Sequence, residues 1–249
     1  MTGVQTCALP IWSHELDNVS GFRQRNSNVP YYNPNQFYAS GDTDVRNALV
    51  FSGGWDLPFD HLWQSGPKAL TSGWSIYPIV TWHTGFPLDV YAGLNTTHND
   101  PGPSGAGDAG YVRADLVGNS IGILNPQSYQ TINGNAGNYY FNPGNFSNTR
   151  LLNLDSIAQQ DASQLPGYTY GTLGRNSFRG PGATNVDLAI AKKFKIREQA
   201  TLELRGDAFN VFNHTQFGNP DTTISDLTFG QISTTAAPRI LQVALHLSF

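Results

Sequence analysis

The end of the chain alternates strictly between apolar and polar side chains. Leu241, Val243, Leu245, Leu247 and Phe249 stand at every second position, and smaller or polar residues separate them. Because successive side chains of a strand point to opposite faces of a sheet, this spacing predicts a β-strand with one apolar and one polar face.

The same two-residue period marks further strands. Counting the last one, the predicted strands cover residues 12–16, 45–57, 74–82, 186–196, 202–213 and 241–249. In the third strand, Trp74 and Trp82 share a face at a separation of roughly 26 Å along the strand. With the usual tilt of a barrel strand, this spacing matches the height between the two aromatic girdles of an outer-membrane barrel.

The links between these strands alternate in length. The links at 59–69 and 197–199 are short, and those at 18–44, 93–183 and 214–238 are long. Outer-membrane barrels have short periplasmic turns and long extracellular loops. The pattern therefore predicts an all-β fold: an antiparallel outer-membrane β-barrel fragment of about six long strands, with the C-terminus in the periplasm.

The composition agrees with strands rather than helices in the membrane. Hydrophobic residues make up 39% of the 249 positions and charged residues 13%, both below the usual share of a soluble domain. The chain lacks a run of about 18 apolar residues, so only tilted strands could cross a bilayer. A net charge of -4 argues against nucleic acid as a partner.

Residues 1–11 differ in character from the rest of the chain. They lack the features of a signal peptide and resemble a translated sequencing-adapter fragment, so we expect the native chain to begin near Trp12. The single cysteine, Cys7, falls in this segment. A remainder without cysteine suits a protein exported through an oxidising periplasm.

Several short motifs resemble the Oar-like subgroup of TonB-dependent receptors, in which a carboxypeptidase-regulatory-like domain and a plug precede the barrel. The motifs are Trp12–Asn18, Asp44–Asn47, Leu57–Phe59, Thr84–Pro87, Arg113–Gly118, Gly174–Asn176, Gly180–Gly182, Asn185–Asp187 and Phe209–His214. The family usually has His where Asn47 stands. The resemblance covers almost the whole chain from Trp12, so residues 12–249 are interpreted as the C-terminal part of such a barrel.

The resemblance implies a barrel of about 22 strands that is filled by a plug. Such a receptor binds an extracellular solute and admits it with energy from TonB. The implied partners are outer-membrane lipid, the barrel assembly machinery, an unknown small solute, and a plug and TonB through the missing N-terminal part. Leu245, Leu247 and Phe249 resemble the C-terminal signal that the assembly machinery reads.

Two sets of residues are candidates for contact with plug or solute. The first is a set of charges expected to face the barrel lumen: Asp187, Lys193, Glu203, Arg205 and Asp207. The second is an aromatic and amide-rich loop: Tyr139, Tyr140, Phe141, Asn142 and Phe146. A structural ion-pair lattice is the favoured alternative for the first set, and loop packing would explain the second.

Other chemistry finds little support in the sequence. Gly105–Gly110 matches a dinucleotide-binding pattern but lacks a preceding strand, and Asn99, Asp100 and Asp108 lack the fixed spacing of a calcium loop. Neither a catalytic motif nor a metal or cofactor site is predicted, so we expect no enzyme. The alternative functions are a secreted β-sandwich that binds glycans and a complete small outer-membrane barrel.

Overall fold

The computed structural model describes residues 4–18, 20, 35, 37–63, 65–93, 113–153, 171–197 and 200–249. Gly105–Gly110 and the calcium candidates Asn99, Asp100 and Asp108 lie outside these residues.

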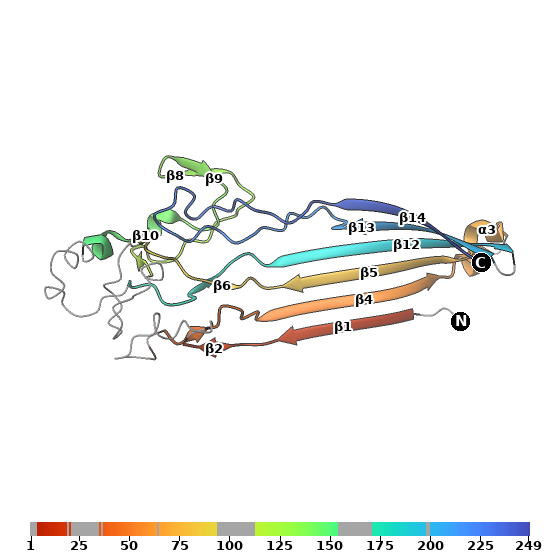
Figure 1. Cartoon of the computed structure of the whole chain (residues 1–249), viewed down its shortest axis with the longest axis horizontal. Coiled ribbons are helices and arrows are strands. Elements are labelled where there is room, and N and C mark those ends of the chain that lie inside the picture. Colours follow the sequence, from red (N-terminus) through yellow and green to blue (C-terminus); the bar gives the residue numbers. More distant parts are fainter. Residues whose placement is uncertain are drawn as a thin grey trace.

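Six long strands form one antiparallel sheet in the order β1-β4-β5-β12-β13-β14. Their bounds are β1 Val4–Trp12, β4 Asn47–Leu57, β5 Trp74–His83, β12 Ala183–Arg197, β13 Ala200–Phe209 and β14 Ile240–Ser248. Figure 1 shows them side by side in a single extended layer. The predicted all-β, antiparallel architecture is therefore confirmed.

Two strands differ from the prediction by more than three residues at an end. The first strand was expected at residues 12–16, but β1 covers Val4–Trp12 and pairs without interruption from Val4↔Trp55 to Trp12↔Asn47. Strand β13 ends at Phe209 rather than near residue 213. The reason is that Asn210 and Asn213 both have positive φ, a left-handed conformation that ends an extended strand.

The register sorts the side chains of the sheet onto two faces. Val186, Leu188 and Ile190 of β12 pair with Val80, Pro78 and Ile76 of β5, and paired residues share a face. On the same face, Leu204 pairs with Leu245 and Leu202 with Leu247. We call this the apolar face; the residues between, including Asp187 and Glu203, form the polar face. The predicted division of the strands is thus confirmed.

Strand β1 departs from this division. Its register places Leu9 and Ile11 on the polar face, opposite Val50 and Ala48 of β4. The other five strands follow the expected alternation of apolar and polar side chains more closely than β1 does. The adapter-like origin of residues 1–11 stays a prediction, although these residues complete an edge strand.

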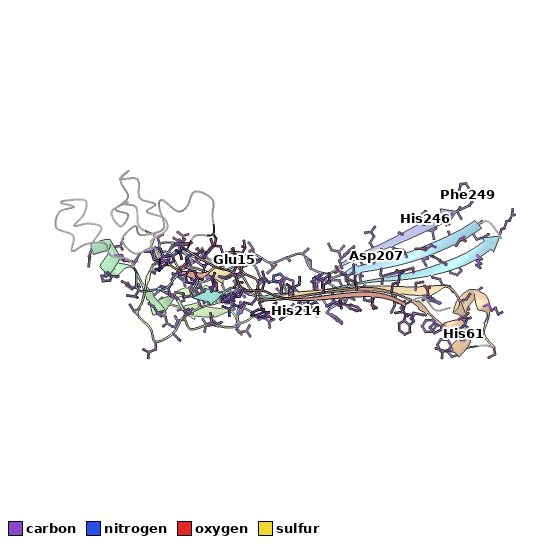
Figure 2. All side chains as sticks on the ribbon, turned by 90° about the horizontal axis from the view of Figure 1, so that it is seen from below. Glu15, His61, Asp207, His214, His246 and Phe249 are labelled. Carbon is purple, nitrogen blue, oxygen red and sulfur yellow. The ribbon has the colours of Figure 1, made fainter. Side chains whose placement is uncertain are left out.

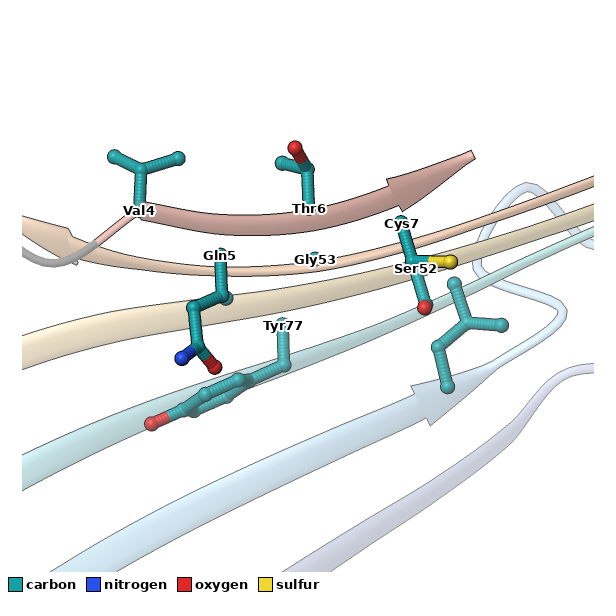
Figure 3. A pocket seen from close by; sticks show the side chains of 9 residues that line it. Val4, Gln5, Thr6, Cys7, Ser52, Gly53 and Tyr77 are labelled. Carbon is teal, nitrogen blue, oxygen red and sulfur yellow. The ribbon is translucent and has the colours of Figure 1, made fainter. Parts of the chain in front are cut away.

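The sheet is hollowed on its polar face. Gln5, Cys7, Ser52 and Tyr77 line this hollow, and Figure 3 shows Gln5 and Tyr77 pointing to one side of the sheet while Val4 and Thr6 point to the other. Gly54 lies beneath the Tyr77 ring, where an added Cβ would sit 3.1 Å from ring carbons. The Gln5 and Tyr77 side chains in this hollow thus point to the polar side of the sheet.

The short links lie at one end of the sheet and the long links at the other (Figure 1). The β4–β5 link holds two short helices, α2 Phe59–Leu62 and α3 Lys68–Thr71, and the β12–β13 link is two residues long. Figure 2 shows His61 and Phe249 at this end and Glu15 toward the opposite end. The predicted alternation of long and short links is confirmed.

The long links fold into small elements beyond the sheet. These pair as β2 Leu16–Asp17 with β3 Ala39–Ser40, β6 Pro87–Leu88 with β11 Phe178–Arg179, β7 Asp115–Leu116 with β10 Phe146–Ser147, and β8 Gln130–Ile132 with β9 Asn135–Gly137; a 3-10 turn, η2, covers Pro143–Asn145. The hydrophobic core lies here rather than on the sheet. It comprises Val90, Ala114, Phe141, Phe146, Leu173, Phe178 and Phe229.

Aromatic rings hold this core together. Phe141 meets Phe146, Phe178 and Phe229 edge to face, with ring centroids 5.2 to 5.5 Å apart. This geometry adds about 0.5–1.5 kcal/mol per pair to the burial of the rings. In the described part of the chain, none of the helices is long and apolar enough to cross a membrane.

Candidate functional site

Acidic and basic side chains gather where the long links leave the sheet. We call this the loop-base cluster; its members are Asp17, Asp42, Asp44, Asp89, Arg113, Arg175, Asn176 and Arg179. They come from three separate stretches of sequence: the β1–β4 link, the segment after β5 and the segment before β12.

Arg175 is the centre of the cluster. Its side chain is 5% exposed, and Nη1 donates to Asp17 Oδ1 over 2.5 Å and to the Asp17 carbonyl over 3.0 Å. Nη2 donates to Ser20 Oγ over 2.6 Å and to Asp42 Oδ1 over 2.8 Å. Burial alone would lower the pKa of Arg175, but the carboxylates of Asp17 and Asp42 raise it above its ordinary value. Arg175 is thus a fixed positive charge shared by two acidic residues.

Asn176 extends the contacts of Arg175 in two directions. Its Nδ2 donates to the Ser40 carbonyl and to Asp42 Oδ1, each over 2.7 Å, and its backbone N–H donates to Asp89 Oδ1 over 2.6 Å. Asn176 has a φ of 49°, in the left-handed region, which asparagine tolerates better than most residues. Asp89 in turn pairs with Arg113, whose guanidinium lies over the Phe37 ring.

Arg179 makes the second ion pair of the cluster. It donates to a carboxylate oxygen and to the carbonyl of Asp44, and also to the carbonyl of Gly85. Burial would raise the pKa of Asp44, but the backbone N–H of Glu15 and the Arg179 guanidinium outweigh it and hold the pKa below its usual value. Asp44 is therefore anionic at neutral pH, and its charge ties the β1–β4 link to β11.

Two backbone segments also approach each other closely beside the loop-base cluster, one at Gly85 and the other at Gly180. A Cβ on Gly85 would sit 1.8 Å from the Gly180 carbonyl oxygen, so the two segments touch through main chain only. The Gly180 N–H donates to the Phe86 carbonyl over 2.9 Å. Glycine at position 85 is required by this approach.

The cluster explains several motifs that carried the family resemblance. Asp17, Asp44, Arg113 and Arg175 each belong to one of those motifs, and the fold brings them together. These motifs are visible in the sequence, but contacts between them were not predicted. Charged residues of opposite sign within these motifs were the available signal.

The aromatic candidates lie inside the loop region. Tyr139, Phe141 and Phe146 are buried, and Phe141 and Phe146 belong to the hydrophobic core. The Tyr140 hydroxyl donates to the Arg179 carbonyl, and burial raises its pKa. Asn142 accepts from the Gly144 N–H and caps η2. The structure therefore explains these residues by loop packing, because the three buried rings offer little surface on which a solute could stack.

One small hollow remains beside them. It has a volume of about 260 Å³ and is lined by Ile132, Asn133, Asn135, Tyr139, Pro143, Phe146, Ile224, Asp226, Leu227 and Phe229. Its lining combines aromatic rings with amide and carboxylate groups. A ligand-contacting role for Tyr139 and Phe146, which stays a prediction, would have to act through this hollow.

The predicted lumen charges lie together on the polar face. Lys193 and Glu203 are cross-strand partners with an Nζ–Oε2 distance of 3.6 Å. Arg205 binds Asp207 over 2.9 Å on the same strand. Asp187 accepts from Asn185 Nδ2 and from the Asn210 N–H. Four of the five charges therefore form two ion pairs, and Asp187 is held by neutral donors. Contact of these residues with a plug or solute stays a prediction.

Among the residues that the structure describes, none of the His, Cys, Asp and Glu side chains form a group of three or more that could hold a metal ion. The charged groups of the loop-base cluster are engaged with one another. The ion pairs and hydrogen bonds of the cluster thus join the β1–β4 link to segments of the β5–β12 link.

Comparison with protein families gives a match that spans most of the chain. Residues 3–242 match the family described as outer membrane beta barrel domain, and the chain belongs to that family. Its location is therefore the outer membrane, its apolar face is the lipid-facing side, and its polar face lines the lumen. Neither the search of curated proteins nor the search of solved structures returned a match.

The sandwich alternative does not agree with these findings. A β-sandwich would bury the apolar face of its sheet against a second sheet. In the described part of the chain that face is open: Val243 is 77% exposed and Leu245 67%. The family match and this exposed face both favour the outer-membrane barrel over the secreted sandwich.

Proposed function

We propose that the chain is the C-terminal part of the barrel of a TonB-dependent receptor of the Oar-like subgroup. Such a receptor binds an extracellular solute and admits it with energy from TonB. The observation that carries the proposal is the loop-base cluster. Motifs that are far apart in the sequence, among them those that hold Asp17, Asp44 and Arg175, come together in this cluster, as expected if they belong to the long links of one receptor barrel.

The shape of the sheet supports a larger barrel. Among the described strands, β1 pairs with β4 alone and β14 with β13 alone, so both edges of the sheet have unpaired backbone groups. Lipid cannot satisfy such groups, and outer-membrane barrels avoid the cost by closing. Further strands would complete the barrel, as the resemblance implies.

The two faces of the sheet suit the proposed partners. The apolar face would contact outer-membrane lipid, and the paired charges of the polar face would line the space that a plug fills. TonB and the plug would act through the missing N-terminal part, and the assembly machinery would read Leu245, Leu247 and Phe249. On this proposal the chain performs no catalysis, binds no nucleic acid and needs no cofactor.

Two measurements test the proposal without knowledge of the solute. First, the genomic reading frame upstream of the Trp12 codon should encode a plug domain in frame. Second, a purified periplasmic domain of TonB should capture the detergent-solubilised full-length protein but not the chain that starts at Trp12.

The contrary results are equally clear. A reading frame without a plug would remove the basis for TonB coupling. Equal capture of the two proteins by TonB would show that the contact lies in the barrel strands, against the proposal.

A further inference from the structure

Lys192 breaks the pattern of the lipid-facing side. It stands in register with Trp74 of β5 and Leu204 of β13, both on the apolar face. Lysine on the lipid face of an outer-membrane barrel costs up to about 2–4 kcal/mol, depending on depth. Nevertheless, Lys192 is 3% exposed, so something other than lipid surrounds its ammonium group.

The β4–β5 link surrounds this ammonium group. Nζ of Lys192 donates to the Leu70 carbonyl over 3.2 Å and to the Ser72 carbonyl, and it lies 5.2 Å from the centroids of the Trp74 and Phe194 rings. The Leu70 carbonyl also accepts from Trp74 Nε1 over 2.8 Å. These carbonyls belong to the C-terminal turn of α3, where carbonyl groups lack helical partners. The lysine and the helix end satisfy each other.

A sharp reversal at Gly73 makes this contact possible. Gly73 has a φ of 78°, and its carbonyl accepts from the Lys193 N–H over 2.9 Å. An added Cβ at Gly73 would lie 2.6 Å from the Lys193 carbonyl oxygen. The link therefore turns tightly against β12 and lies over the apolar face.

The same link exposes large apolar side chains. Leu62 is 68% exposed, Trp63 61% and Leu70 65%, and the Phe59 and Trp63 rings lie 5.6 Å apart. In an aqueous link these side chains would keep their apolar surface in water, at about 25 cal/mol per Å². Tryptophan is favoured at the headgroup level of membranes, and lysine stems there lie along apolar surface.

We propose that residues 58–63 and 65–73 form an interfacial anchor that lies in the periplasmic leaflet of the outer membrane. Leu62, Trp63 and Leu70 enter the boundary between headgroups and acyl chains, and Lys192 is the tether that holds α3 against the lipid-facing side. The occupant of this surface is the phospholipid leaflet because the link binds Lys192 on the lipid-facing side of the sheet, next to Trp74. The proposal rests on the outer-membrane location and does not depend on TonB.

Spin labels at the link test the anchor. In a cysteine-free background of the full-length protein, nitroxides are attached at Leu62→Cys and Leu70→Cys, and the labelled protein is reconstituted in phosphatidylethanolamine and phosphatidylglycerol vesicles. Labels at Val243→Cys and Val117→Cys give the lipid and water references, since Val243 is 77% exposed on the apolar face and Val117 62% exposed in a long link.

The expected result is a ratio of oxygen to nickel-chelate accessibility at both link positions that is several-fold above that of Val117→Cys. A ratio equal to that of Val117→Cys would overturn the proposal. In that case the apolar side chains would stand in the periplasm, available to a protein partner there.

The tether has its own test. Lys192→Met removes the ammonium group but keeps an apolar side chain, and the label at Leu70→Cys should then become accessible to the nickel chelate. Lys195→Met is the matched control, since Lys195 lies on the polar face opposite Thr201. Heat-modifiable mobility shows that each variant is folded. A label that stays in lipid in folded Lys192→Met protein would overturn the role of Lys192.

Discussion

The guanidinium of Arg175 donates to the carboxylate of Asp17, which stands 158 positions earlier in the chain. The two residues lie on two different long links of the sheet, β1–β4 and β5–β12. Their contact fixes how the extracellular segments lie above the strands. It does so without adding a strand pair to the membrane-spanning sheet.

Replacing Arg175 by Met should loosen the extracellular region while leaving the strands in place. Breaking a buried ion pair costs about 3–5 kcal/mol because it leaves uncompensated charge. The value here should fall at or below the lower end, since the Asp42 side chain is 51% exposed. Protease added to intact cells should cut the long links faster, with unchanged heat-modifiable mobility of the barrel.

Arg46→Met is the control for this change. Arg46 is 44% exposed and its Nε lies 3.6 Å from Asp44 Oδ2, so its loss should cost less than about 1 kcal/mol. If Arg175→Met and Arg46→Met were cut at the same rate as wild type, the cluster would not order the links.

Acid should release the β1–β4 link through Asp44. The pKa of Asp44 in the folded protein is below the ordinary value of 3.8. Its stabilising contribution is therefore complete above about pH 3.8 and is lost as the pH falls below 3.8 through the folded pKa. The amide protection factor of Glu15, whose N–H donates to Asp44, should be constant from pH 6 to pH 4 and fall below that range, these limits following from a reference pKa of about 3.9.

Asp44→Asn provides the comparison for the acid experiment. Without an ionisable group at position 44, the protection factor at Glu15 should be lower at neutral pH and should depend less on pH. A wild-type profile that matches that of Asp44→Asn would assign the acid response to other groups.

The strands and their faces could be predicted from sequence because alternation is a local signal. Leu241 to Phe249 and Val186 to Ile190 show it directly, and the register follows once one face is apolar. The contacts of Arg175 could not be predicted, because its partners are far apart in the sequence. Lys192 was missed for a related reason: it interrupts the apolar row, and its partners are backbone carbonyls of a link that was expected to be a simple turn.

The aromatic residues show another limit of the sequence. Tyr139, Phe141 and Phe146 have the composition of a recognition loop, and the same composition forms a core when rings meet edge to face. The contacts of Phe141 with Phe178 and Phe229, which come from two other segments, could not be predicted from that composition.

A charge on the lipid-facing side should destabilise the barrel far more than a charge on the lumen side. Val243→Lys places an ammonium in the apolar row opposite Gly206, at a cost of about 2–4 kcal/mol near the bilayer midplane. Gln242→Lys, one position away, points into the polar face opposite Asp207 and should be close to neutral. Urea unfolding in detergent or lipid, followed by heat-modifiable mobility, gives both values. Equal losses would show that the two faces are assigned incorrectly.

Phe249 should matter for assembly rather than for stability. Its side chain is 98% exposed, just beyond the end of β14, and by alternation it continues the lipid-facing row. Phe249→Ala removes at most about 1.5–3 kcal/mol of transfer free energy, too little to unfold a closed barrel. If the assembly machinery reads the terminal ring, the variant should insert more slowly and give less folded barrel in the membrane.

Leu241→Ala is the matched control, since it shortens an exposed side chain of the same row at the opposite end of β14 and should insert normally. Pulse-labelled cells, sampled over time and assayed by heat-modifiable mobility, separate the rate of insertion from the stability of inserted protein. Equal insertion rates for Phe249→Ala and Leu241→Ala would show that the terminal ring is not read as a signal.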